Sequence, residues 1–240
     1  MKRLTHAVML LLGLSMVIMA SCTKDPDNGG NNGGGNNGNT YNGHEYVDLG
    51  LPSGTLWATC NVGATTPEGW GDLFAWGETT PKLSYTEDNY KYSIFVGPVD
   101  DWSYYKFTKY CCMPESGYNG FTDNLRTLEA MDDAAIVNWG NGWHTPSKED
   151  FVELLRFTTC QVSSQNNVVG WTFIGINHNS IFLPKITAID PQYGWDYSGG
   201  CWMNALSDRD SFSGRAFNGL NEDSSISRHL GLPVRPVCSR

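Results

Sequence analysis

The sequence predicts an α+β domain with two helices and long irregular loops. Helical patterns occur only in the middle of the chain, and short apolar runs separated by turn residues precede and follow them. Strands, then helices, then strands again favour an α+β fold over alternating βαβ units. The 27 Gly, 11 Tyr, 10 Phe and 9 Trp of this 240-residue chain also favour a domain built mainly of strands and loops.

Strands are expected first within residues 44–64. Tyr46–Leu49 and Leu56–Ala58 flank the sequence Pro-Ser-Gly, in which proline sets φ and glycine accepts a positive φ, as a tight turn requires. Residues 69–78, GWGDLFAWGE, form an aromatic segment between glycines, and we expect a further strand there. Residues 79–121 show no clear period, so we expect a long irregular insertion with short elements.

Two helices are expected next. Residues 128–139 are good helix formers and bring four apolar side chains near one stripe: Leu128, Met131, Ala135 and Trp139. In residues 144–157, Thr145 is the expected N-cap and Pro146 the first helical residue, with acidic Glu149 and Asp150 at the positive end of the helix. The expected buried face of this second helix is Phe151, Leu154 and Leu155.

The rest of the chain predicts strands again. Residues 169–185 hold two strands joined at Asn-His-Asn, residues 177–179, which indicates a hairpin. From Tyr193 to Cys238 short apolar segments alternate with polar loops, and no internal repeat is evident.

The first 22 residues are organised like a lipoprotein signal. Two basic residues precede an apolar run of 14 residues, 7–20, which is shorter than the about 20 residues that a transmembrane helix needs. Small residues, Ala20 and Ser21, then precede Cys22. This arrangement resembles a bacterial lipobox, although Met19 stands where leucine is usual. The resemblance implies removal of the signal peptide, residues 1–21, and lipidation of Cys22; the alternative is an ordinary signal peptide followed by an incidental cysteine.

Residues 22–43 are expected to be a tether. Residues 28–39 are only Asn and Gly, and such a segment has no apolar group to bury and stays disordered. The Thr-Lys-Asp sequence after Cys22 resembles the signal that sends Bacteroidetes lipoproteins to the outer face of the outer membrane. We therefore expect an outer-membrane, lipid-anchored protein that faces the cell exterior, with its folded domain at residues 44–240.

The net charge of the chain argues against two classes of partner. Without residues 1–21 the chain has 14 Lys and Arg against 25 Asp and Glu, a net charge of −11. Nucleic acid is not an expected partner, because affinity for it rests on neutralising phosphates. Electrostatic binding to a membrane is disfavoured as well, so the lipid has to provide the anchor. We expect a monomer.

Motifs for catalysis or metal binding are missing from the sequence. It contains no H-E-x-x-H, no C-x-x-C, no G-x-S-x-G and no P-loop lysine at the needed spacing. We therefore expect no enzyme activity, no catalytic residue, no metal ligand and no cofactor, although the acidic loops leave a structural calcium ion open. Six cysteines follow Cys22, and in an exported protein they allow disulfides or free thiols: Cys60, Cys111, Cys112, Cys160, Cys201 and Cys238.

Six segments, in the same order, resemble one family. They are YVDLGLPSGTLWATCNVGA (46–64), GDLFAWGET (71–79), GYNGFTDN (117–124), DDAAIVNWGNGWHTPSKEDF (132–151), NSIFLP (179–184) and GLPVRPV (231–237). They are similar to Bacteroidetes lipoprotein relatives of the Fibrobacter succinogenes major paralogous domain. The resemblance covers nearly all of residues 44–238. It implies a C-type-lectin-like fold, in the variant shared with formylglycine-generating enzymes, with twisted antiparallel sheets, neighbouring termini and a ligand face made by C-terminal loops.

The chain departs from this family mainly in the C-terminal third. Residues 143–147 replace the usual Trp-Arg-Met-Pro-Thr, residues 185–189 replace Ala-Ala-Gly-Tyr-Arg, and residues 201–204 replace Tyr-Trp-Ser-Ser. The sequences with which sugar-binding lectins of this fold hold calcium, Glu-Pro-Asn or Gln-Pro-Asp with Trp-Asn-Asp, are missing. The scaffold segments therefore match better than the segments expected to bind a ligand.

The resemblance implies an adhesin-like, ligand-binding protein of the cell surface. A related subset of these lipoproteins serves as the variable protein of diversity-generating retroelements, with diversified positions in the C-terminal stretch. Residues 195–230 mix aromatic and polar residues, as adaptable binding faces do. Trp202 and Phe217 are expected to be core residues of strands. The expected ligand-binding residues are Trp195, Asp196, Tyr197, Asn204, Asp208, Arg209, Asp210, Phe212, Arg215, Asn218, Asn221 and His229, and the expected ligand is an unknown surface protein or glycan.

Two other functions stay open. One is a structural subunit of a surface appendage or complex that pairs through edge strands. The other is the cysteine oxidase activity of formylglycine-generating enzymes, with Cys201 and Cys238 as the reactive pair. The residues around these cysteines do not match that family, and a buried thiol or a disulfide is the commoner fate of such residues.

Overall fold

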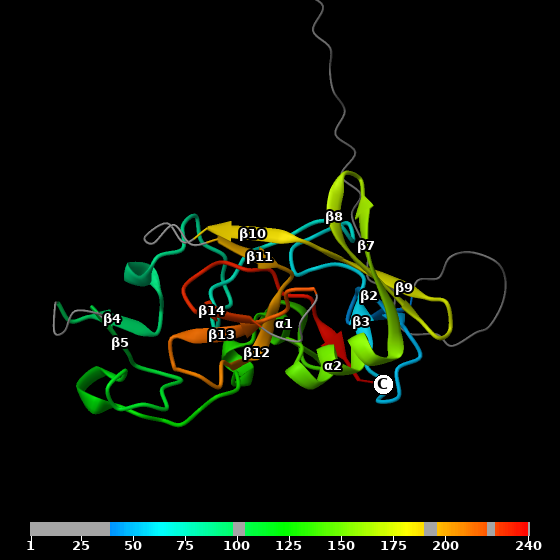
Figure 1. Cartoon of the computed structure of the whole chain (residues 1–240). Helices are drawn as coiled ribbons and strands as arrows, with labels where there is room; N and C mark the ends of the chain where they lie inside the picture. The colour runs from blue at the N-terminus through cyan, green and yellow to red at the C-terminus, as the bar shows by residue number, and fades with distance from the viewer. Residues whose placement is uncertain (1–38, 98–103, 190–195, 220–223, 240) are drawn as a thin grey trace, which may run out of the picture. The chain divides into compact units, whose positions relative to one another are not determined.

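The computed structural model describes residues 39–97, 104–189, 196–219 and 224–239 (Figure 1). The chain from Gly38 to Arg240 clusters as one compact unit. The described part is mixed, with two α-helices and sheets whose paired strands are all antiparallel, which fits the α+β class. The expected signal peptide, the lipidation site Cys22 and most of the expected tether lie outside the described residues.

A five-stranded sheet brings the two ends of this unit together. The C-terminal strand lies between strands from the first and the middle part of the chain, because Val237 pairs with both Trp57 and His144. The first strand begins at Thr40, four residues before the expected start of the domain at residue 44. The strand order is β1 (Thr40–Tyr41), β2 (His44–Asp48), β3 (Leu56–Ala58), β15 (Val237–Cys238) and β6 (Trp143–His144).

The predicted strand at residues 69–78 is wrong. Only Phe74 forms a bridge there, to Leu232. Glycines with positive φ, Gly71 and Gly77, turn the backbone on either side of Phe74, so no ladder of paired residues extends from it. The insertion that follows holds only short elements, as expected: η1 (Glu87–Asn89), β4 (Ser93–Phe95), β5 (Tyr105–Phe107) and η2 (Tyr118–Gly120).

The first helix is shorter than predicted. Helix α1 spans Ala134–Trp139 and follows a separate 3-10 turn, η3 (Ala130–Asp132). It begins where it does because Asp133 caps it, accepting hydrogen bonds from the amides of Ala135 and Ile136. Met131, expected on the buried stripe, is 70% exposed.

The second helix, α2, spans Lys148–Phe157 and is capped by Ser147 rather than by Thr145. Ser147 and Asp150 form a reciprocal capping box. Thr145 is instead held by Asp133, whose carboxylate accepts from both its amide and its hydroxyl. Phe151 and Leu154 are fully buried and Leu155 is partly buried, which confirms the predicted apolar face.

A second, three-stranded sheet follows α2 directly. It consists of β7 (Thr158–Gln165), β8 (Val168–Gly175) and β9 (Ser180–Pro184), and the hairpin expected between the last two is confirmed. Strand β7 was not predicted. Asn166 and Asn167 both have positive φ, as a two-residue type I′ hairpin turn requires. The β7–β8 hairpin reaches beyond the neighbouring strands, at the top of Figure 1.

The C-terminal third forms two further sheets, as the alternation of short strands and polar loops predicted. One is the pair β10 (Ile186–Ile189) and β11 (Asp196–Gly199). The other has the order β12 (Trp202–Leu206), β13 (Ser213–Ala216) and β14 (Ser224–Ser227). Trp202 and Phe217 are 2% and 0% exposed, so their expected place in the core is confirmed. Phe217 stacks on Phe151 of α2 at 4.6 Å between ring centroids.

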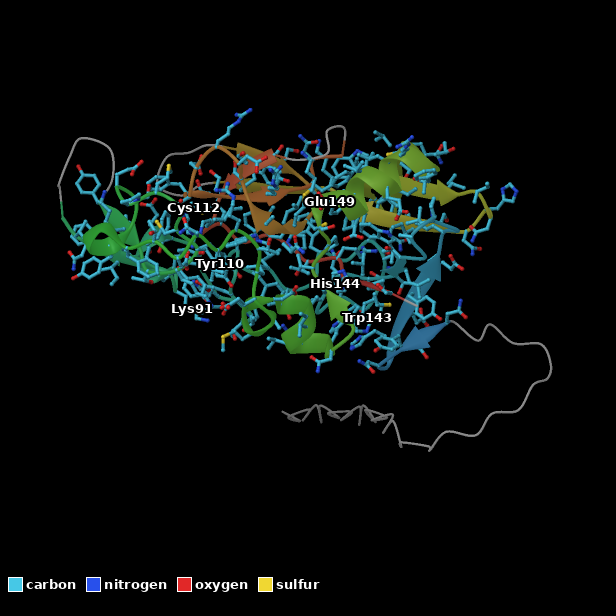
Figure 2. The ribbon with its side chains drawn as sticks, turned by 90° about the horizontal axis from the view of Figure 1, so that it is seen from below. Lys91, Tyr110, Cys112, Trp143, His144 and Glu149 are labelled. Atoms are coloured by element: carbon cyan, nitrogen blue, oxygen red, sulfur yellow. The ribbon has the colours of Figure 1, made fainter. Side chains whose placement is uncertain are left out.

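A buried carboxylate organises the polar part of the core. Asp132 is 2% exposed and accepts hydrogen bonds from Lys91 at 3.1 Å, Lys109 at 2.6 Å, Tyr110 at 2.8 Å and Tyr92. Burial by itself would raise its pKa, but these bonds outweigh burial and lower the pKa of Asp132 to about 2. Figure 2 shows Lys91 and Tyr110 in the same part of the molecule, although 19 positions separate them in the sequence.

Two buried arginines of the last segment bind backbone carbonyl groups. Arg235, in the GLPVRPV segment, is 0% exposed and donates to the side chain of Asn61 and to the carbonyl oxygens of residues 58, 59 and 67. Arg228 is 1% exposed and donates to the carbonyl oxygens of residues 109, 110 and 211. Both therefore tie the C-terminal segment to loops from earlier in the chain.

Candidate functional site

A polar groove lies where the β12–β13–β14 sheet meets the start of α2. Its larger part is a hollow of about 530 Å³. An adjoining hollow of about 370 Å³ shares Lys148, Asp208 and Arg215 with it, so the two form one surface, here called the C-terminal groove. The larger hollow is lined by Lys148, Ser207, Asp208, Arg209, Arg215, Asn218, Ser224, Ser225 and Ile226.

The start of α2 contributes one wall of the C-terminal groove. The capping box fixes Ser147 as the residue before the helix, so Lys148 and Glu149 occupy its first turn and reach the groove. Figure 2 shows Glu149 at the start of α2, next to strands β12 to β14. The backbone also connects the two walls, because the amide of Asn204 in β12 donates to the carbonyl oxygen of Pro146 at 2.9 Å.

An ion pair crosses the groove between β13 and the loop after β12. Arg215 is 8% exposed, donates from Nε to the carbonyl oxygen of Leu206 at 3.0 Å, and pairs with the carboxylate of Asp208. Arg126 lies 4.0 Å from the same carboxylate and donates to the carbonyl oxygen of Ser207 at 2.5 Å. The hydrogen bond from Arg215 and the positive charge of Arg215 lower the pKa of Asp208, so the exposed Asp208 side chain is ionised at neutral pH.

Short hydrogen bonds hold the loop that carries these side chains. Asp210 accepts from the amides of Phe212 and Ser213, each at 2.8 Å. Beyond the end of β13, Asn218 donates to the hydroxyl of Ser224, the first residue of β14, at 2.7 Å. The loop therefore presents Asp208 and Arg209 from a fixed turn, and both side chains are exposed.

The structure gathers five of the twelve predicted ligand-binding residues around the groove. They come from strands β12 and β13 and from the loops that follow each of them: Asn204, Asp208, Arg209, Arg215 and Asn218. Of the remaining predicted residues, Trp195 and Asn221 lie outside the described residues, and only the backbone of Asp196 is described.

Four of the predicted residues do not belong to this surface. Tyr197 is 7% exposed, and its hydroxyl donates to the carbonyl oxygen of Phe217 at 2.7 Å. Phe212 is partly buried and packs edge-to-face on Phe107. His229 is 5% exposed and lies beside a separate hollow of about 40 Å³. The carboxylate of Asp210 accepts hydrogen bonds from amides of its own turn. Burial removes Tyr197 and His229 from the expected binding face, because a ligand cannot reach side chains that fill the interior, and Phe212 does not line the groove.

Two cationic residues of the groove were not predicted. Arg126 and Lys148 lie 82 and 60 positions before Asp208. Arg126 is the second residue after the segment 117–124, and Lys148 lies inside the segment 132–151, both of which were interpreted as scaffold. The sequence carries one signal for Lys148: the Thr-Pro-Ser sequence, residues 145–147, predicts the start of a helix and so places Lys148 in its first turn. No local pattern marks Arg126.

The six described cysteines are free thiols. Cys201 is fully buried, and burial raises its pKa to about 12; burial likewise raises the pKa of Cys238 to about 11. A reactive cysteine needs the thiolate form, which these surroundings disfavour. Neither thiol borders the C-terminal groove.

The described part of the chain holds neither a metal-binding group nor a membrane-spanning helix. No three His, Cys, Asp or Glu side chains there come together as a group that could hold a metal ion. No helix among these residues is long and apolar enough to cross a membrane. Comparison with known proteins finds no match among protein families, curated proteins or solved structures.

Proposed function

We propose that this protein is a non-enzymatic, surface-anchored binding protein whose C-terminal groove holds a hydroxyl-rich ligand, namely a glycan. The observation that carries the proposal is the groove itself. It is wide, it is open to solvent, and eight of the nine residues lining its larger part are polar or charged.

The lining explains why a glycan is the preferred ligand class. Pockets for small apolar ligands are lined mainly by hydrophobic side chains. Here serine hydroxyls, an asparagine amide and fixed arginine and carboxylate groups alternate over the surface, and Ile226 is the single apolar residue of the larger hollow. A ligand that covers these groups displaces the water to which they are hydrogen-bonded. It has to offer them new hydrogen bonds, since a buried polar group left unsatisfied costs about 1–3 kcal/mol. Sugar hydroxyls offer both donors and acceptors at close spacing.

Sequence features support the surface-anchored part of the proposal. The lipobox-like sequence at Cys22 and the Asn/Gly segment would hold the domain away from an outer membrane. The resemblance to lectin-like Bacteroidetes lipoproteins supports a ligand face in the C-terminal third. Asp208 and Arg209 are exposed loop residues, so they are positions where diversification would alter the ligand without disturbing the core.

A glycan array probed with the purified protein and two arginine variants tests the proposal. Arg209→Ala removes an exposed cation of the groove, whereas Arg156→Ala removes an exposed cation from the far end of α2. We expect a defined set of glycans to bind the wild type and the Arg156 variant, and binding to fall about tenfold in the Arg209 variant, as loss of one charge-assisted hydrogen bond predicts. An array on which the wild type binds nothing, or on which Arg209→Ala changes nothing, contradicts the assignment.

A further inference from the structure

The β7–β8–β9 sheet is unusual in its lack of charge. From Thr158 to Pro184 the sequence contains no Asp, Glu, Lys or Arg, although these residues make up 17% of the chain. The three strands and their two connections occupy this whole segment. The surroundings of this uncharged segment, and above all its open strand edge, can explain why it contains no charged residue.

Strand β7 forms the outer edge of this sheet. Its eight residues pair with β8 in unbroken register, from Thr158 opposite Gly175 to Gln165 opposite Val168. Edge strands of soluble proteins are usually protected by charges, proline, bulges or short length. Strand β7 has none of these protections.

Hydrogen bonds elsewhere in the sheet show which backbone groups of β7 are open. Lys185 donates to the carbonyl oxygen of Val169, and Gly175 donates to that of Asn179, so the odd-numbered residues of β8 face β9. The even-numbered residues of β8 therefore face the odd-numbered residues of β7. The N–H and C=O groups that point away from the sheet belong to Cys160, Val162 and Ser164, and none of the hydrogen bonds that described residues make outside helices and strands reaches these groups.

Side chains near the outer half of this edge are exposed and apolar. Val162 is 68% exposed, and Val169, on the same face of the hairpin, is 50% exposed. At the inner end Cys160 is partly buried against the core cluster around Trp171 and Phe173. The open backbone row and the exposed valines thus lie together near the tip of the hairpin.

We propose that two copies of this chain pair through β7 in an antiparallel, two-fold symmetric arrangement, which joins their sheets into one six-stranded sheet. A pairing centred on Val162 places Cys160 of one copy opposite Ser164 of the other and forms about six backbone hydrogen bonds. The inference goes beyond the proposed ligand binding and proposes a dimer in place of the expected monomer.

The charge distribution favours a second copy as the occupant of the edge. The chain is acidic, with a net charge of −9, so two copies repel each other over most of their surface. An uncharged edge that meets itself brings no like charges together, and it places the exposed Val162 opposite Val162 of the other copy. A charged partner strand would find no countercharge on β7.

The oligomeric state of the full chain and three variants tests this proposal. Val162→Lys places a charge at the centre of the pairing, and Ser164→Pro removes an outward N–H while leaving the hydrogen bonds to β8 in place. Ile176→Lys is the matched control, because Ile176 is 80% exposed in the β8–β9 connection and away from the β7 edge. Light scattering along a dilution series measures the mass, and circular dichroism confirms that each variant folds.

We expect a dimer for the wild type and for Ile176→Lys, and a shift to half that mass for both edge variants. A wild-type monomer at every concentration overturns the proposal. A dimer that survives Val162→Lys, or one that Ile176→Lys also dissolves, overturns it as well. If Ser164→Pro does not fold, the comparison of the two lysine variants decides.

Discussion

Replacing Asp132 by Asn should destabilise the domain in a manner that depends on pH. The substitution keeps the size of the side chain and removes its charge. It leaves Lys91 and Lys109 without the carboxylate to which both now donate, at 3.1 Å and 2.6 Å. It also places an amide N–H₂ group beside lysine donors, so at least one hydrogen bond of the cluster is lost.

The pKa of Asp132 sets the magnitude. Its ordinary value is 3.8, and the fold lowers it to about 2. Each unit of pKa corresponds to about 1.4 kcal/mol, so the ionised carboxylate contributes about 2 kcal/mol to the free energy of unfolding. Because the folded-state pKa is the lower one, this stability is present above the unfolded-state pKa and is lost as the pH falls from about 4 to about 2.

Denaturant unfolding of the wild type and of Asp132→Asn, at about pH 7 and about pH 2.5, measures both effects. We expect the variant to be less stable by about 2 kcal/mol at neutral pH, and most of that difference to disappear at the acidic pH. Asp208→Asn is the control, since Asp208 is also paired with arginine but is 79% exposed, and it should leave the unfolding midpoint unchanged. An Asp132 variant as stable as the wild type, or one equally destabilised at both pH values, would refute this account of the cluster.

Three further changes have defined outcomes. Phe217→Ala removes a ring stacked at 4.6 Å on Phe151 and should cost about 3–5 kcal/mol in denaturant unfolding, whereas a cost below about 1 kcal/mol would contradict its place in the core. Arg235→Met leaves the carbonyl oxygens of residues 58, 59 and 67 without their donor and should cost about 3 kcal/mol by the same assay, with Arg156→Met as the neutral control. Cys22→Ser should release the protein from membranes in a fractionation experiment with its circular dichroism unchanged; a variant that stays in the membrane fraction would show that Cys22 is not the anchor.

Helix α2 shows what could be predicted from the sequence. The spacing of Phe151 and Leu154 identified the buried face of α2, because a helix with period 3.6 has to bury its apolar stripe. The predicted cap, Thr145, lies two residues before the observed cap, Ser147. Thr145 and Ser147 are both good caps, and the choice was made by Asp133, which holds Thr145 from a distant part of the backbone.

Strand β7 was missed for a related reason. Its sequence, TTCQVSSQ, has no strict apolar alternation, since most of its side chains are exposed on both faces. The strand forms because all eight of its residues pair with β8 and because the Asn-Asn turn connects the two strands as a tight hairpin. Pairing of this kind depends on the neighbouring strand, which a local pattern does not show.

The sequence predicted the residues that the loop after β12 contributes to the groove, but not the cationic residues of the opposite wall. Asp208 and Arg209 stood out because charged residues between short strands usually lie at the surface. Tyr197 and His229 were assigned to the same surface from composition, and the structure buries both. Arg126 reaches the groove through tertiary packing alone, and no local pattern indicates that contact. For Lys148 the sequence shows only that it lies in the first turn of a helix, not what that turn contacts.

The groove and the β7 edge are linked by helix α2. The first residue of the helix, Lys148, lines the groove, and Thr158, the first residue of β7, follows its last residue directly. Ten helical residues span about 15 Å, so the two surfaces lie at opposite ends of a short rigid element. Pairing through β7 therefore leaves the groove of each copy open. A dimer of this kind would present two grooves to one surface, and binding a second glycan residue of the same polymer would strengthen attachment without any new contact. In the proposed dimer the uncharged edge would multiply the affinity of a groove that, under the proposed function, binds one ligand by itself.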